Sequence, residues 1–193
     1  INYFRNCRTR FSLEEWIDVL ISALDYTPST FSNMPQKLEF LTRLLPFIEP
    51  RLNFIELAPK GTGKSYVFGN LSKFVWLVSG GKVSRAKLVY DKSIKAPGIM
   101  RFYDMVAFDE IQTITFSDNS EMQSFLKNYL EYGRATIDNY EFMSECGLML
   151  LGNILLNDSN EPISHNYFET LPEVFRESAL LDRFHGMIEG WLL

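Results

Sequence analysis

The sequence has little of what marks secreted, membrane-bound or strongly basic proteins. Its two cysteines, Cys7 and Cys146, are too few and too scattered for a disulfide framework or a zinc site. Its longest apolar runs, at 74–78 and 147–151, are far shorter than the roughly 20 residues of a membrane-spanning helix. The net charge of −5 excludes a domain coated in lysine and arginine. We therefore expect a cytoplasmic protein with no membrane partner, in which only a narrow basic strip would hold nucleic acid.

The composition that is present is typical of one globular domain. Hydrophobic residues make up 46% and charged residues 22% of the 193 positions, which is enough for a buried core and too little charge for a disordered chain. The chain begins at Ile1 without an initiator methionine or a basic segment leading into an apolar run, and it ends on the apolar residues 190–193. We interpret it as a piece of a longer protein.

Residues 1–50 predict a helical lead-in. Ser12 and Glu15 have the spacing of a capping box, and apolar residues follow them at helical spacing. A second helix is expected around Lys37 to Leu45, ending near two prolines that cannot donate a backbone hydrogen bond. From residue 51 onward the pattern changes, and we expect a separate α/β core over 51–193.

The core contains five apolar runs of strand length. They are Phe54–Leu57, Phe74–Val78, Met105–Phe108, Leu148–Leu151 and Phe184–Ile188. Between the third and the fourth run, Ser117 or Asp118 can cap an amphipathic helix that repeats apolar residues at three- and four-residue spacing. Continuous apolar strands separated by helices predict a five-stranded parallel sheet covered on both faces, that is, a three-layer α/β/α fold.

The most specific motif follows the first strand and precedes a helix expected from Lys64 to about Ser72. It is the Walker A loop Ala58-Pro59-Lys60-Gly61-Thr62-Gly63-Lys64-Ser65, with Ala58 in place of the usual first glycine. Its glycines allow backbone N–H groups to curl around phosphate oxygens. The expected nucleotide-binding residues are Pro59, Lys60, Gly61, Thr62, Gly63, Lys64, Ser65 and Tyr66. Lys64, expected to be solvent-exposed, would reach the β- and γ-phosphates of ATP, and Ser65 would bind Mg²⁺. The alternative is a glycine-rich turn with an incidental Gly-Lys-Ser.

The third strand predicts the partner motif, Walker B. Residues 102–110 read as an apolar strand that ends in two adjacent carboxylates. Asp109 would hold the magnesium ion through water, and Glu110 would polarise the attacking water. The alternative is a solvated turn at the end of a strand. Together the two motifs indicate a P-loop NTPase fold.

Two further segments resemble those of AAA+ ATPases. Asn153 follows the fourth strand and resembles sensor 1, the polar residue that orients the attacking water; alternatively, it only turns the chain into the next loop. Arg183, just before the fifth strand, resembles an arginine finger, and Arg176 is a second candidate. The alternative is that Arg183 pairs with Asp182, Glu177 or Glu173 of its own subunit.

Read together, five segments resemble the Lon-protease-like ATPase of bacteriophage-exclusion (BREX) defence systems. They are FIELAPKGTGKS, VSGGKVSRAKLVY, DMVAFDE, LLGN and LPEVFRESALLDRFHGMIEGW, the last being the most family-specific. The resemblance implies a hexameric AAA+ ring that acts with other defence components and engages DNA. It also implies a lid and a C-terminal Lon-protease-like domain, both of which would lie beyond Leu193.

Three functions remain open from the sequence: an ATP-driven motor acting on DNA, a protein unfoldase feeding a protease, and a nucleotide-gated assembly switch with little hydrolysis. Residues 80–87 are an expected loop after the second strand that carries three cations, and they are the better candidate for contacting DNA. The alternative is a flexible charged turn leading into a helix. Residues 134–146 predict a hairpin turned by Asp138-Asn139. Its carboxylates, Glu141 and Glu145, make it unsuited to gripping phosphates.

Overall fold

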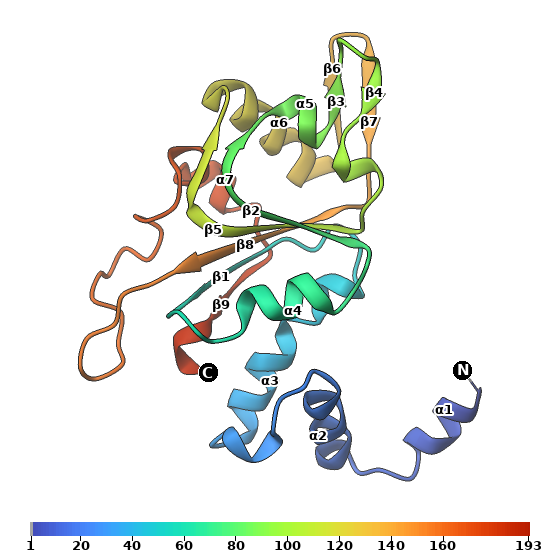
Figure 1. The fold of residues 1–193 in the computed structure, drawn as a ribbon, viewed down its shortest axis with the longest axis vertical. Coiled ribbons are helices and arrows are strands. Elements are labelled where there is room, and N and C mark those ends of the chain that lie inside the picture. Colours follow the sequence, from blue (N-terminus) through green and yellow to red (C-terminus); the bar gives the residue numbers. More distant parts are fainter. Residues whose placement is uncertain (1) are drawn as a thin grey trace.

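A five-stranded parallel sheet forms the centre of the computed structural model, which describes residues 2–193 (Figure 1). The strand order is β2-β5-β8-β1-β9. The strands are β1 (Phe54–Ala58), β2 (Val75–Val83), β5 (Met105–Phe116), β8 (Gly147–Asn153) and β9 (Gly186–Glu189). Every neighbouring pair runs parallel. The predicted three-layer P-loop fold with a five-stranded parallel sheet is therefore confirmed.

Helices cover both faces of this sheet, because alternate side chains of each strand point to opposite sides. On one face, Met105 and Ala107 of β5 pack in a core with α4 (Lys64–Asn70). On the other face, Val106 and Phe108 pack with α6 (Asn119–Tyr132). The smaller helices are α5 (Arg85–Leu88), α7 (Ser178–Leu181) and the 3-10 turns η3 (Ile99–Arg101), η4 (Glu173–Phe175) and η5 (Gly190–Leu192). Burial on both faces explains why the strands read as continuous apolar runs.

The lead-in consists of α1 (Asn2–Arg8), α2 (Leu13–Ala23) and α3 (Met34–Thr42), with 3-10 turns η1 (Pro28–Thr30) and η2 (Leu45–Phe47). The predicted capping box of Ser12 and Glu15 is present at the start of α2. The second helix was predicted three residues too late, because its cap is Asn33, whose side chain accepts the Gln36 N–H at 2.9 Å. The lead-in packs beneath α4 and β9 (Figure 1).

Two strands continue well past the predicted ends. Strand β2 reaches Val83 and β5 reaches Phe116, and the two pair again over 81–83 and 114–116 after a break in register. The break is made possible by Gly80 and Gly81, whose φ values of 65° and 82° lie in the left-handed region that glycine adopts freely. Residues 80–87 therefore form the end of β2 and most of the helix α5, and the expectation of a loop there is wrong.

Two small antiparallel sheets project together from one end of the molecule (Figure 1). They are the pair β3 (Tyr90–Asp91) with β4 (Ala96–Pro97), and the pair β6 (Arg134–Ile137) with β7 (Tyr140–Met143). The second pair is the predicted hairpin, turned at Asp138 and Asn139 with a positive φ of 51° at Asp138. Tyr90 and Tyr140 stack with ring centroids 4.0 Å apart, so the two hairpins pack against each other.

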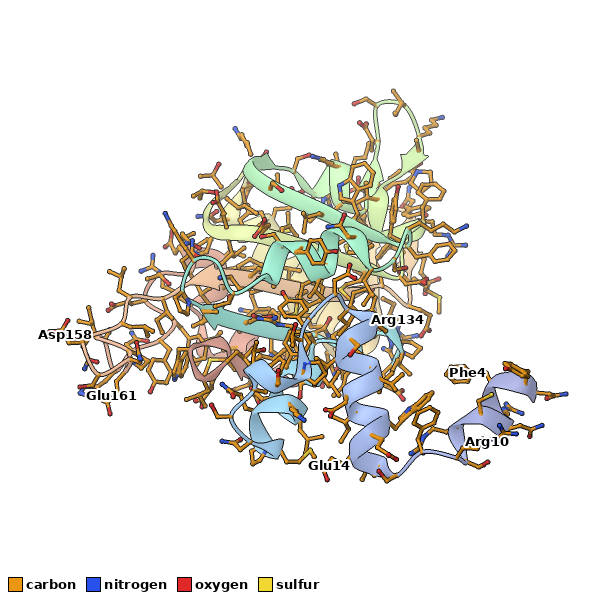
Figure 2. The ribbon with its side chains drawn as sticks, turned by 60° about the horizontal axis from the view of Figure 1, so that its bottom comes forward. Phe4, Arg10, Glu14, Arg134, Asp158 and Glu161 are labelled. Atoms are coloured by element: carbon orange, nitrogen blue, oxygen red, sulfur yellow. The ribbon has the colours of Figure 1, made fainter. Side chains whose placement is uncertain are left out.

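The N-terminal helix and the loop after β8 lie on opposite sides of the molecule (Figure 2). The loop that carries Asp158 and Glu161, after β8, projects from the side of the molecule opposite Phe4 and Arg10 (Figure 2). Helix α1 has no buried residue and contacts α2 mainly through Trp16, which meets the rings of Phe4 and Phe11. None of the helices in residues 2–193 combines the length and the apolar character that crossing a bilayer requires.

Candidate nucleotide-binding site

The loop between β1 and α4 curls back on itself at two glycines. Gly61 has a φ of 87° and Gly63 a φ of 76°, both in the left-handed region. Gly63 caps α4, and a side chain there would collide with the hydroxyl group of Tyr26 from the lead-in. Glycine is therefore required at Gly63 for both backbone conformation and space.

Lys64 is folded back onto its own loop. Its ammonium group donates to the carbonyl oxygens of Ala58 at 3.0 Å and Pro59 at 2.9 Å, and to Oδ1 of Asn153 at 3.3 Å. The residue is only 6% exposed, so the expectation of a solvent-exposed lysine is wrong. Burial lowers the pKa of Lys64, and the nearby carboxylate of Glu56 opposes this shift.

A single cavity brings most of the predicted site residues together. It has a volume of about 430 Å³ and is lined by Lys60, Gly61, Thr62, Gly63, Lys64, Ser65, Tyr66, Asp109, Glu110 and Asn153. The lining residues come from the loop, from α4, from the middle of β5 and from the carboxyl end of β8. Residues up to 93 positions apart in the chain are thus collected at one edge of the sheet, where open α/β sheets bind their ligands.

The two carboxylates of the cavity lie at a bulge inside β5. Asp109 still pairs with Ser79 of β2, but four residues of β5 then pass before Ile114 pairs with Gly81. Glu110 begins this bulge with a φ of 49°, a strained conformation for a residue with a side chain. Its N–H donates to Oδ1 of Asp109 at 3.0 Å. The carboxylates therefore sit at an interruption of the strand, whereas the sequence predicted the end of the strand.

A buried ion pair lies directly beneath the loop, and the sequence reading missed it. Arg43, just after α3, and Glu56 of β1 have fully buried side chains. Nε and Nη2 of Arg43 donate to the Glu56 carboxylate at 2.5 to 3.2 Å. The remaining nitrogen, Nη1, donates to the carbonyl oxygen of Thr62 at 3.2 Å. Burial raises the pKa of Glu56, and Arg43 opposes that shift.

The lead-in also contacts α4 beside the cavity. The hydroxyl group of Tyr66 donates to Oδ2 of Asp25 at 2.7 Å, and this contact raises the pKa of Tyr66. Asp25 has a φ of 63°, which turns the chain between α2 and Tyr26. A smaller cavity of about 140 Å³ lies between the end of α2 and α4. The lead-in thus contacts both the loop and the helix that follows it.

The two candidate arginine fingers lie outside the cavity. Nε of Arg183 is 2.8 Å from Oε2 of Glu131 on α6, and the Arg183 guanidinium also donates to the carbonyl oxygen of Ala179. The alternative carboxylates considered for Arg183 are not its partners; Glu177, for example, pairs with Lys127 at 2.6 Å. Arg176 is exposed and lines a separate groove of about 470 Å³ along β5 and residues 169–176.

The sheet order, the glycine loop and the carboxylates on the neighbouring strand define the class of the protein: it is a P-loop ATPase domain. The family model described as "Lon-like protease BrxL-like, ATPase domain" matches residues 1–193. The chain belongs to this family.

Two curated relatives carry the name Lon-like protease BrxL. The relative from Escherichia coli O9:H4 (strain HS) is 34% identical over 188 residues, which cover 96% of this chain and 26% of the relative. The relative from Bacillus cereus (strain H3081.97) is 36% identical over 187 residues, covering 95% of this chain and 27% of the relative. The chain thus spans about a quarter of the length of these relatives.

Proposed function

We propose that this domain binds ATP with Mg²⁺ in the cavity lined by the glycine loop and hydrolyses it. The observation that carries the proposal is the convergence of Lys64, Ser65, Asp109, Glu110 and Asn153 on one space. Lys64 and the loop N–H groups bind the phosphates, and Glu110 accepts a proton from the attacking water. Asn153 orients that water from the neighbouring strand.

The donor set suits a magnesium ion. Mg²⁺ prefers oxygen ligands and keeps several of its waters. The hydroxyl group of Ser65 and the carboxylate of Asp109 both line the cavity and supply such oxygens. Bound there, the ion would offset negative charge on the phosphates.

ATP hydrolysis and nucleotide binding by the full-length protein test this proposal. We expect Mg²⁺-dependent release of phosphate, and loss of that release when Ser65 or Asp109 is replaced by alanine. Lys73→Ala, on an exposed residue away from the cavity, is the matched control. Hydrolysis that survives at the wild-type rate in both site variants would remove the cavity as the site of catalysis.

We infer that the active form is a homo-oligomeric ring, a hexamer, in which Arg183 acts on the nucleotide of the neighbouring subunit. Neither Arg183 nor Arg176 lines the cavity of its own chain, which supports an action across a subunit boundary. An arginine suits this task because its planar, permanently charged guanidinium can form paired hydrogen bonds to phosphate oxygens. Mass measurement of the full-length protein with and without ATP tests the ring.

We further propose that hydrolysis is coupled to DNA, together with the other defence components that the BREX resemblance implies. Arg85 of the basic segment 80–87 is held 2.9 Å from Glu121, which leaves Lys82 and Lys87 exposed. The β3–β4 turn adds the exposed cation Lys95, while Lys92 of the same turn pairs with Asp138 of the β6–β7 hairpin. These lysines offer phosphate contacts that the acidic β6–β7 hairpin alone does not.

Salt-dependent binding of double-stranded DNA tests this coupling. We expect Lys82→Gln/Lys87→Gln to weaken binding and to flatten its salt dependence, because two phosphate contacts are removed. Lys73→Gln removes a surface lysine elsewhere and should change neither. Stimulation of ATP hydrolysis by an unfolded polypeptide and not by DNA would instead favour the protein-unfoldase alternative, which the name of the curated relatives supports.

A further inference from the structure

We propose that Arg43 is a positioning residue for the nucleotide: it holds the peptide between Thr62 and Gly63 so that its N–H group points toward the phosphates. The inference rests on the proposed nucleotide site and adds a residue of the lead-in to it. Arg43 itself does not line the cavity and touches the loop only through the Thr62 carbonyl oxygen.

The geometry of a trans peptide carries the argument. In a planar trans peptide the C=O and N–H groups point in opposite directions. Arg43 lies on the buried side of the loop and draws the Thr62 carbonyl oxygen inward at 3.2 Å. The N–H of Gly63 belongs to the same peptide and is therefore directed away from Arg43, toward the side on which Gly63 lines the cavity.

The loop needs such a constraint because it is built to be flexible. Glycines flank Thr62 on both sides, at positions 61 and 63, and glycine has the widest choice of backbone conformations. A rotation of the Thr62–Gly63 peptide would turn the carbonyl oxygen toward the phosphates, where its negative end would repel them. A hydrogen bond from a charged, fully buried guanidinium favours the orientation that presents the N–H.

Stability alone does not explain the ion pair. Removing two charges from water is costly, and apolar residues of similar volume are often as stable or more stable at such sites. Both Arg43 and Glu56 are nevertheless buried, and their contacts extend to the loop. Glu56 fixes the guanidinium through two of its nitrogens and leaves Nη1 aimed at Thr62. The pair is thus arranged as a support for the loop.

The test uses the full-length protein with Arg43→Met/Glu56→Met, which removes both charges and keeps the volume. The matched control is Asp18→Asn/Lys37→Met, which removes an ion pair at 2.6 Å between α2 and α3 that does not reach the loop. The probes are inorganic pyrophosphate with Mg²⁺ and adenosine, each measured by displacement of a fluorescent ATP analogue. The melting temperature without nucleotide is measured in parallel.

We expect the Arg43/Glu56 variant to melt within a few degrees of wild type and to bind pyrophosphate about tenfold more weakly, the value of one hydrogen bond to a charged group. Adenosine binding and the control variant should be unchanged. A folded variant with wild-type pyrophosphate affinity, or one that loses both probes equally, overturns the positioning role.

Two further outcomes are decisive. If the double variant does not fold, Arg43→Lys is measured instead, because lysine keeps a charge beside Glu56 but lacks the fork that also reaches Thr62. Wild-type pyrophosphate binding in that variant overturns the inference. A wild-type protein that binds neither ATP nor pyrophosphate would overturn the proposed nucleotide site itself, which is a different result from a failure of Arg43 alone.

Discussion

The change Arg183→Ala distinguishes a catalytic role of this arginine from a structural one, because the two roles predict very different losses of turnover. As an arginine finger, Arg183 would stabilise the transition state on the neighbouring subunit, and its loss would reduce turnover about a thousandfold. That factor corresponds to about 4 kcal/mol of activation free energy. As a structural residue, Arg183 would only join α7 to α6 through Glu131.

The structural role is worth much less. The side chains of Arg183 and Glu131 are 29% and 42% exposed, and the Nε–H is not aligned for a hydrogen bond although the ion-pair distance is 2.8 Å. Pairs this accessible to water contribute about 0–1 kcal/mol to stability. For a domain of this size, each kcal/mol of lost stability lowers the melting temperature by about 2–4 °C. Turnover should hardly change at a temperature where the protein remains folded.

The matched control is Glu131→Gln, which breaks the same ion pair and keeps the guanidinium. We expect Arg183→Ala to bind ATP and to be nearly inactive in phosphate release, while Glu131→Gln keeps turnover close to wild type. Mixing Arg183→Ala with an inactive Lys64→Ala subunit should restore part of the activity, because some interfaces then combine an intact loop with an intact finger. If mixed rings form and no activity returns, or if Glu131→Gln loses as much turnover, the finger assignment is wrong and Arg176 is the next residue to test.

Three other changes have defined outcomes. Lys64→Ala should abolish ATP binding in calorimetry while circular dichroism shows a folded protein, because water from the cavity can reach the carbonyl oxygens that the lysine leaves; unchanged affinity would contradict the loop assignment. Glu110→Gln should retain ATP and stop phosphate release, because an amide cannot accept the proton of the attacking water, and normal turnover would exclude Glu110. Burial raises the pKa of the Cys146 thiol to about 12, so iodoacetamide at pH 8 should modify Cys7 and spare Cys146 until the protein is unfolded, as mass spectrometry would show.

The parts of the fold that the sequence predicts are those with local causes. The loop 58–65 follows from its glycines and from the strand and helix on either side, and the hairpin over 134–143 follows from its two-residue turn. The extension of β2 and β5 has no such local signal. Gly80 and Gly81 look like a turn in the sequence, and the strands continue only because they pair with each other across the bulge.

The buried residues that hold the loop of the candidate site in place were the hardest to predict from the sequence. Arg43 and Glu56 lie in different parts of the chain and meet because α3 packs against β9, the neighbour of β1 in the sheet. The one available signal was a charged residue inside the apolar run 54–57, because such a residue is rarely buried without a partner. The exposure of Lys64 was misjudged because its long side chain reaches carbonyl oxygens of its own loop.

The strand order explains how Asn153 connects the two halves of the candidate site. Strand β8 lies between β1 and β5, so the residue at its carboxyl end faces both the loop and the bulge. Oδ1 of Asn153 accepts from Lys64 at 3.3 Å, and its N–H donates to Oε1 of Gln112 in the bulge at 3.4 Å. In the proposed site, a phosphate that draws the Lys64 ammonium toward itself would compete with the side chain of Asn153, whose backbone N–H is bonded to the bulge that follows Glu110. These two contacts are what the proposed sensor role of Asn153 requires, and a residue that only turns the chain would lack them.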